Sequence, residues 1–117
     1  MKIEKVPISE AALHRSIRNL LQVKGIVYFE STFGRRTTMQ LGMPDFVFAA
    51  YTSRISHAMK MIPGHVANAW ECKIGNKQLT PEQDMMFRKL QYQPNCWKCT
   101  VIRSLDQAIE ELEALGI

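Results

Sequence analysis

The chain has 117 residues, of which 46% are hydrophobic, 22% charged and 9% aromatic. This composition is typical of one compact globular domain and excludes a disordered or fibrous chain. No apolar run approaches the ~18 residues of a membrane span, the first residues lack a signal-peptide pattern, and three cysteines do not suit a secreted disulfide framework. We expect one domain over residues 1–117 in an intracellular, cytoplasmic protein with no membrane partner.

The net charge of +4 is unevenly distributed along the chain. Residues 1–104 hold all fifteen lysines and arginines but only seven of the eleven acidic residues. A basic body of this kind is typical of proteins that bind polyanions such as nucleic acid. A solvated basic surface explains the charge equally well, so charge alone does not decide the partner.

Capping residues ahead of apolar stripes predict three helices. Ser9 is a suitable N-cap for a helix over residues 10–24, which Gly25 can end. Thr80-Pro81-Glu82-Gln83 combines an N-cap, a proline at the first helical position and a capping-box glutamine, and it opens a second helix. Ser104-Leu105-Asp106-Gln107 repeats the capping pattern and opens the last helix.

Four strands are expected between these helices, at residues 26–33, 46–51, 67–74 and 99–102. The resulting order, α-β-β-β-α-β-α, predicts an α/β fold with a small mixed β-sheet flanked by helices. Residues 34–44 form a basic loop in this prediction, and residues 52–67 form a long connection. The five phenylalanines, Phe29 among them, are expected in the core.

Two carboxylates and one ammonium are expected to meet at one end of this sheet. Glu71 and Lys73 share a strand face, whereas Cys72 points to the other. Asp45 opens the preceding strand, which can pair beside Glu71. Charges buried in this way are costly unless they are paired or hold an ion. An ordinary ion pair at a strand edge would explain Glu71 and Lys73 taken by themselves.

The residue types suit the hydrolysis of phosphate esters. Carboxylates of Asp45 and Glu71, with the backbone carbonyl of Cys72, are suitable ligands for a hard cation such as Mg²⁺ or Mn²⁺. Such a cation lowers the pKa of a bound water and neutralises charge that builds up on a phosphate. Lys73 could position or deprotonate that water.

Three short motifs surround the predicted site: Gly42-Met43-Pro44-Asp45, Trp70-Glu71-Cys72-Lys73 and Leu79-Thr80-Pro81-Glu82-Gln83. Together they resemble the virus-type replication-repair nuclease (VRR-NUC) domain of the PD-(D/E)xK nuclease superfamily, in its stand-alone viral or prophage form. The resemblance implies a restriction-endonuclease-like core in which Asp45 and Glu71 bind metal and Lys73 serves catalysis. It also implies a homodimeric DNA endonuclease that cuts branched DNA such as Holliday junctions in DNA repair, in a bacterial or virus-infected cell.

Glu10 and Gln83 match a glutamate and a glutamine that the family carries on its helices. Glu10 also continues the apolar stripe of the first helix, so it should face inward and support the metal. The helix dipole alone explains a glutamate in the first turn, but not its inward direction. Gln83 joins the core face of the second helix, where a catalytic role and simple capping are equally suitable explanations.

Basic side chains around the site are the expected DNA contacts. They are Arg35 and Arg36 in the loop before Asp45, Arg15 and Arg18 on the first helix, and Lys77 in the turn after Lys73. His14 is expected on the polar side of the first helix, beside the arginines. The alternatives are a DNA-binding module that does not cleave, a sequence-specific restriction endonuclease, and a thiol-redox protein that uses Cys96 and Cys99.

Overall fold

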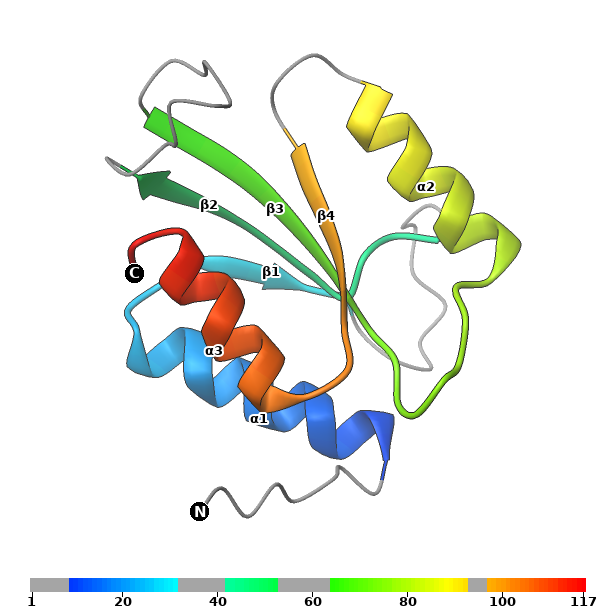
Figure 1. Ribbon diagram of the computed structural model, residues 1–117, viewed down its shortest axis with the longest axis horizontal. Helices are drawn as coiled ribbons and strands as arrows, with labels where there is room; N and C mark the ends of the chain where they lie inside the picture. Colours follow the sequence, from blue (N-terminus) through cyan, green and yellow to red (C-terminus); the bar gives the residue numbers. More distant parts are fainter. Residues whose placement is uncertain (1–8, 32–41, 53–63, 93–96) are drawn as a thin grey trace.

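The computed structural model of the chain describes residues 9–31, 42–52, 64–92 and 97–117. These residues form three helices and four strands in the order α-β-β-β-α-β-α, which confirms the predicted α/β fold (Figure 1). In chain order the elements are α1 (Glu10–Val23), β1 (Tyr28–Glu30), β2 (Phe46–Thr52), β3 (Gly64–Cys72), α2 (Pro81–Tyr92), β4 (Trp97–Ile102) and α3 (Leu105–Ala114).

The four strands form one mixed sheet in the order β1-β2-β3-β4. Strand β2 runs antiparallel to both β1 and β3, and β4 runs parallel to β3. Phe46 pairs with Trp70, and Cys72 pairs with Ile102. The start of β2 therefore meets the ends of β3 and β4, and residues that flank these positions gather at one end of the sheet.

Helices cover both faces of the sheet. Lys98 on β4 reaches Glu111 of α3, with 2.8 Å between Nζ and Oε2. The next residue, Cys99, has its sulfur 3.8 Å from the carbonyl oxygen of Phe87 in α2. Because neighbouring side chains of a strand point to opposite faces, α3 and α2 lie on opposite sides of the sheet. Helix α1 packs beside α3 on the same side (Figure 1).

The main core lies between the sheet and the layer of α1 and α3. Phe48 and Trp70 pack edge to face in it, with ring centroids 4.9 Å apart. Phe29 is 77% exposed, so its predicted place in the core is wrong. It lies on the edge strand β1 and points away from α1. Helix α2 lies on that face of the sheet, but it packs against β4 at the opposite edge.

The predicted helix starts are confirmed. Ser9, Thr80 and Ser104 each accept a hydrogen bond on the side-chain oxygen from the backbone N–H three residues on, at 3.1, 3.2 and 3.1 Å. These bonds satisfy donors that the first helical turn leaves without a partner. Helix α1 therefore begins at Glu10, with its carboxylate in the first turn.

Strand boundaries differ from the prediction where backbone pairing decides them. Strand β1 begins at Tyr28 because Ile26 still donates its N–H to the carbonyl of Leu21, at 2.9 Å, and completes the end of α1. Strand β3 begins at Gly64, within the predicted connection, because its first residues pair with the end of β2. Residues 53–63 and 34–41 lie outside the described residues.

Gly42, shortly before β2, lies against the first turn of α2. Its φ is +83°, and a Cβ added to it would lie 2.6 Å from the carbonyl carbon of Glu82. Both the backbone conformation and the space exclude a side chain, so Gly42→Ala is expected to cost about 3 kcal/mol or more of unfolding free energy, measured by urea denaturation. Gly75 is the matched control, because its φ is +56° and an added Cβ would meet nothing within 4 Å. Gly75→Ala should cost only about 1–2 kcal/mol; equal losses would contradict the close packing of Gly42 on α2.

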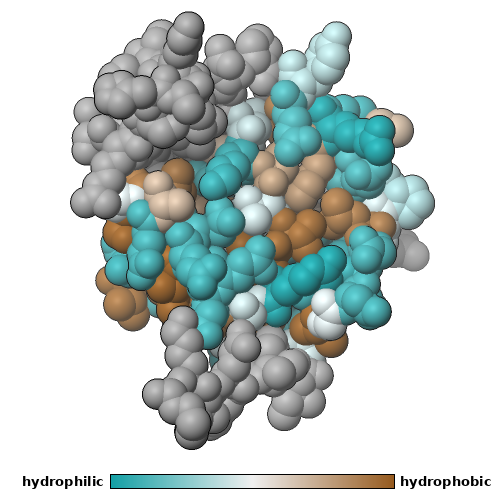
Figure 2. Space-filling model, in the orientation of Figure 1, coloured by the Kyte–Doolittle hydropathy of each residue, from teal (hydrophilic) through white to brown (hydrophobic). Residues whose placement is uncertain are grey.

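No helix in the described part of the chain is both long and apolar enough to span a membrane. Hydrophilic side chains make up much of the described surface in Figure 2, with apolar residues between them. Three large apolar side chains that are exposed, Val23, Val27 and Phe29, lie within seven residues of the chain. This stretch runs from the end of α1 into β1, at the edge of the sheet.

Candidate functional site

Asp45 and Glu71 lie next to each other where β2 begins and β3 ends. Phe46 pairs with Trp70. Asp45 precedes Phe46 and Glu71 follows Trp70, so the two acidic residues are neighbours on adjacent strands. Asp45 Oδ2 accepts a hydrogen bond from the backbone N–H of Cys72 at 2.7 Å, which holds the carboxylate across the end of β3. Glu71 is 1% exposed, and the Asp45 side chain is 14% exposed. The two carboxylates thus share one largely buried place.

The surroundings of Glu71 disfavour its charged form. Neither carboxyl oxygen makes a hydrogen bond of acceptable geometry with any described residue. Burial first, and then the neighbouring Asp45 carboxyl, raise the pKa of Glu71 to about 9. At neutral pH Glu71 therefore keeps its proton unless a cation compensates its charge.

Asp45 is the ionised member of this pair. Burial by itself raises the pKa of Asp45, but His14, the neighbouring Glu71 carboxyl and the hydrogen bond from the Cys72 N–H outweigh burial and hold the pKa below its usual value. His14 Nε2 lies 3.1 Å from Asp45 Oδ2. Burial opposes protonation of His14, yet Asp45 and then Glu30 outweigh burial and raise the pKa of the imidazole.

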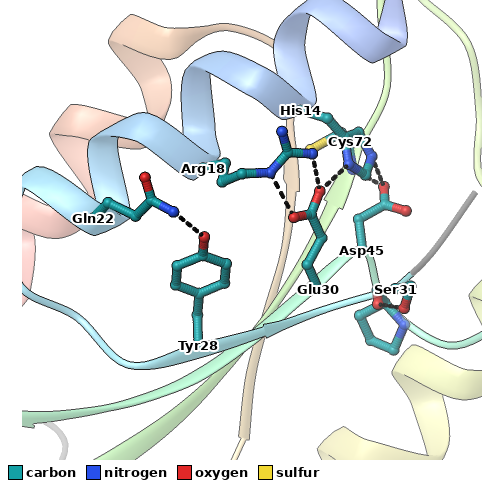
Figure 3. Close-up of polar contacts among 9 residues, drawn as sticks. His14, Arg18, Gln22, Tyr28, Glu30, Ser31, Asp45 and Cys72 are labelled. Atoms are coloured by element: carbon teal, nitrogen blue, oxygen red, sulfur yellow. Dashed lines mark hydrogen bonds and ion pairs between the residues drawn. The ribbon is translucent and has the colours of Figure 1, made fainter.

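A chain of polar and charged side chains runs from Asp45 through His14 of α1 and Glu30 of β1 to Arg18 of α1 (Figure 3). His14 Nδ1 lies 3.3 Å from Glu30 Oε2. Arg18 donates to both carboxylate oxygens of Glu30, at 2.7 Å each. Hydrogen bonding to Arg18 is the main reason that the pKa of Glu30 is lowered. Since a bidentate pair of this kind is geometrically specific, it fixes Glu30, and Glu30 fixes the His14 ring.

The predicted place of His14 on the polar side of α1 is wrong. The side chain is 2% exposed and points to the two carboxylates. It follows Glu10 by four residues, so it belongs to the inward stripe of the helix. A polar residue on that stripe needs buried partners, and Asp45 and Glu30 provide them. Glu30 was not among the predicted site residues, and its only signal in the sequence is an acidic residue within a largely apolar strand.

The Cys72 side chain points away from Glu71 into the core beneath α1. Burial is the first cause that raises the pKa of its thiol, and the further causes are the nearby carboxylates of Asp45, Glu71, Glu10 and Glu30. Glu10 is therefore close enough to act electrostatically on this part of the site. Its Oε1 is buried and has no hydrogen bond within the described residues. Its role as a metal ligand stays a prediction.

Lys73 directly follows β3 and is 7% exposed. Its backbone N–H donates to the carbonyl of Ile102 at 3.0 Å, which extends the pairing of β3 with β4 by one residue. Its positive charge opposes the rise in the pKa of Glu71. Lys73 is thus a largely buried lysine whose charge acts on Glu71, and its catalytic role stays a prediction.

Gln83 takes part in the capping of α2. Its Oε1 accepts a hydrogen bond from the backbone N–H of Thr80 at 2.9 Å, completing the predicted capping box. Gln83 is half-buried, and the backbone of α2 at this residue lies against Gly42, three residues before Asp45. The structure therefore accounts for Gln83 through capping, and a catalytic role stays a prediction.

The predicted DNA contacts differ in what the structure says of them. Arg15 and Lys77 are exposed. Arg18 has an intramolecular partner in Glu30, which was not predicted from the sequence. Arg35 and Arg36, like Cys96 of the CxxC motif, lie outside the described residues. Contact with DNA stays a prediction for all four arginines and for Lys77.

The donor atoms around Glu71 fit a hard divalent cation. Glu71 offers two buried oxygens without hydrogen bonds, and Asp45 offers a second carboxylate beside it. Such oxygen donors suit Mg²⁺ or Mn²⁺. The backbone carbonyl of Cys72 stays a predicted third ligand. Chemically, the carboxylates of Asp45 and Glu71 can hold a cation next to the buried Lys73.

No protein-family model, no curated protein and no solved structure matches the chain.

Proposed function

We propose that the protein is a metal-dependent DNA endonuclease that hydrolyses phosphodiester bonds at Asp45, Glu71 and Lys73. One observation carries the proposal. The buried Glu71 carboxyl has no hydrogen bond from the described residues and lies beside Asp45, with the Lys73 charge acting on it. An arrangement of this kind is costly for the fold, and residues with strongly perturbed pKa values concentrate at functional sites.

Asp45 and Glu71 are proposed to hold Mg²⁺ or Mn²⁺, with Glu10 as a further carboxylate and the Cys72 carbonyl as a neutral ligand. When bound, the metal supplies a more acidic water and positive charge next to a phosphate. Lys73 orients the attacking water or takes its proton.

Gln83, in the first turn of α2, is proposed to assist catalysis beside these residues. The exposed Arg15 and Lys77, together with Arg18, Arg35 and Arg36, are proposed to contact the DNA backbone. Contacts to phosphates carry no sequence information, so binding would depend on the shape of the DNA.

The proposed family is the stand-alone VRR-NUC type of PD-(D/E)xK nuclease, and the proposed substrate is branched DNA, in the cytoplasm of a bacterial or virus-infected cell. The element order and the place of Asp45 and Glu71 at adjoining strand ends support this proposal. A homodimer would bring two sites to a symmetric junction. The exposed Val27 and Phe29, at the edge of the described sheet, are candidates for its contact surface.

A cleavage assay with four-way junction, flap and linear duplex DNA tests this function. We expect cleavage of branched DNA in Mg²⁺ or Mn²⁺ and none in a chelator. Asp45→Asn should remove cleavage but keep DNA binding, whereas Asp84→Asn, on the surface of α2, should keep both. Discrete bands from linear duplex would favour a restriction endonuclease. Binding without any cleavage would favour a DNA-binding module.

A further inference from the structure

The side of β3 that faces α1 carries a second group of potential metal ligands. One ring nitrogen of His14, one carboxylate oxygen of Asp45 and Cys72 Sγ all lie within 4.8 Å of one another. His14 Nε2 and Asp45 Oδ2 are 3.1 Å apart. In Figure 3 the Cys72 sulfur is drawn next to the His14 ring, and a dashed line joins that ring to Asp45. Asp45 is the one residue whose side chain is shared between this group and the carboxylate pair with Glu71.

We propose that His14, Cys72 and Asp45 form a transition-metal site that binds Zn²⁺ in preference to Mg²⁺. Zinc is held tetrahedrally by sulfur, nitrogen and oxygen at about 2.0–2.3 Å, so its ligand atoms lie about 3.3–3.8 Å apart. The three side chains therefore need to approach by at most about 1.5 Å to hold the ion. A water is the expected fourth ligand.

The hydrogen bonds behind His14 are those of a metal-ligating histidine. A histidine that binds metal through one nitrogen usually donates its other N–H to a carboxylate, which fixes the ring and its tautomer. Nδ1 of His14 lies 3.3 Å from Glu30 Oε2, and Nε2 is the nitrogen turned to Asp45. Glu30 is itself held by Arg18 through two bonds of 2.7 Å. Glu30 thus orients the His14 ring, and Arg18 in turn fixes Glu30; neither residue is one of the proposed ligands.

The chemistry of the donors separates this site from the one at Glu71. Thiolate and imidazole select Zn²⁺ and related metals, whereas carboxylate and carbonyl oxygens select Mg²⁺ and Mn²⁺. Strand alternation turns the Cys72 thiol to α1 and the Glu71 carboxyl to the opposite face. Binding of zinc releases the thiol proton of Cys72, and any proton on His14 Nε2, to solvent.

Sharing of Asp45 gives zinc a predictable effect on the enzyme. Asp45 cannot serve both ions equally, so zinc is expected to inhibit cleavage, and Mg²⁺ is expected to relieve the inhibition only at high concentration. This consequence depends on the proposed nuclease function, but zinc binding itself does not. Failure of cleavage would therefore leave the zinc site standing, and failure of zinc binding would leave the nuclease standing.

Cobalt titration tests the site, because Co²⁺ takes tetrahedral zinc sites and gives an optical band when a thiolate binds it. The full-length chain should carry Cys96→Ser and Cys99→Ser, since the CxxC motif could itself bind zinc. In this background Co²⁺ is expected to give the sulfur band, and Zn²⁺ to abolish it by displacement. Adding Cys72→Ser should remove the band, and adding His14→Gln should weaken Co²⁺ binding at least tenfold. Adding Glu71→Gln should keep the band.

X-ray absorption of the zinc-loaded background protein provides a second measurement that needs no change at a ligand. We expect one sulfur neighbour of the zinc, with nitrogen and oxygen making up the rest. A zinc shell without sulfur would overturn the proposal, as would a cobalt band that survives Cys72→Ser or the lack of any band. Circular dichroism establishes that each variant is folded; where Cys72→Ser does not fold, the sulfur neighbour decides.

Discussion

Lys73→Met is expected to slow DNA cleavage about 10²–10⁴-fold, which is the usual contribution of a positioned acid or base. The methionine keeps the apolar length of the lysine at a position that is 7% exposed, so the packing changes little. The cation that orients the attacking water or takes its proton is lost. The measurement is single-turnover cleavage of the preferred branched DNA at saturating enzyme.

The affinity for DNA separates a catalytic role of Lys73 from an electrostatic one. Lys73→Met should leave the dissociation constant within a few-fold of the wild-type value, because the proposed partner of Lys73 is the attacking water and not the phosphates that hold the DNA. Lys89→Met is the matched control, since Lys89 is an exposed lysine on α2. A rate that falls equally in the two variants would contradict the proposed role.

Glu71→Gln is expected to stabilise the metal-free protein at pH 8 by several kcal/mol, although it removes a proposed metal ligand. The pKa of Glu71 is raised from the ordinary glutamate value of 4.5 to about 9, so between these limits the native state keeps a proton that the unfolded chain releases. The wild type therefore loses up to about 1.4 kcal/mol of stability for each unit that pH rises in this window. Glutamine has no proton to lose, so the variant escapes this loss.

Urea denaturation in a chelator from pH 5 to pH 8 measures the difference. The advantage of Glu71→Gln should be small at pH 5 and grow toward pH 8. The lowered pKa of Asp45 acts in the opposite direction, but only below about pH 4, outside this range. Glu110→Gln, at an exposed position on α3, should run parallel to the wild type. A constant difference between the Glu71 variant and the wild type would show that Glu71 is already ionised.

Local signals were sufficient to predict the fold where the chain itself fixes the backbone. Ser9, Thr80 and Ser104 fix the helix starts because each cap is a contact within three residues. The ends of the strands were harder to predict, because they depend on residues far away in the chain. Gly64 joins β3 only because Thr52 lies opposite. Phe29 is exposed because β1 is at the edge of the described sheet, which its sequence does not reveal.

The closeness of Asp45 and Glu71 followed from two strand predictions and one pairing assumption. The links through His14 and Glu30 could not be predicted in the same way, because they join a helix to a strand sixteen residues later in the chain. Polarity suggested an outward direction for His14, and its helical spacing from Glu10 suggested an inward one. The carboxylates that decide between the two directions become visible only in three dimensions.

Mn²⁺ binding to the metal-free protein, followed by electron paramagnetic resonance, tests most directly whether Asp45 and Glu71 hold a cation between them. The wild type and Glu110→Gln should bind with the same affinity. Asp45→Asn and Glu71→Gln should each weaken binding at least tenfold, about 1.4 kcal/mol, while both variants stay folded. Equal affinity in all four proteins would mean that the paired carboxylates are not ligands.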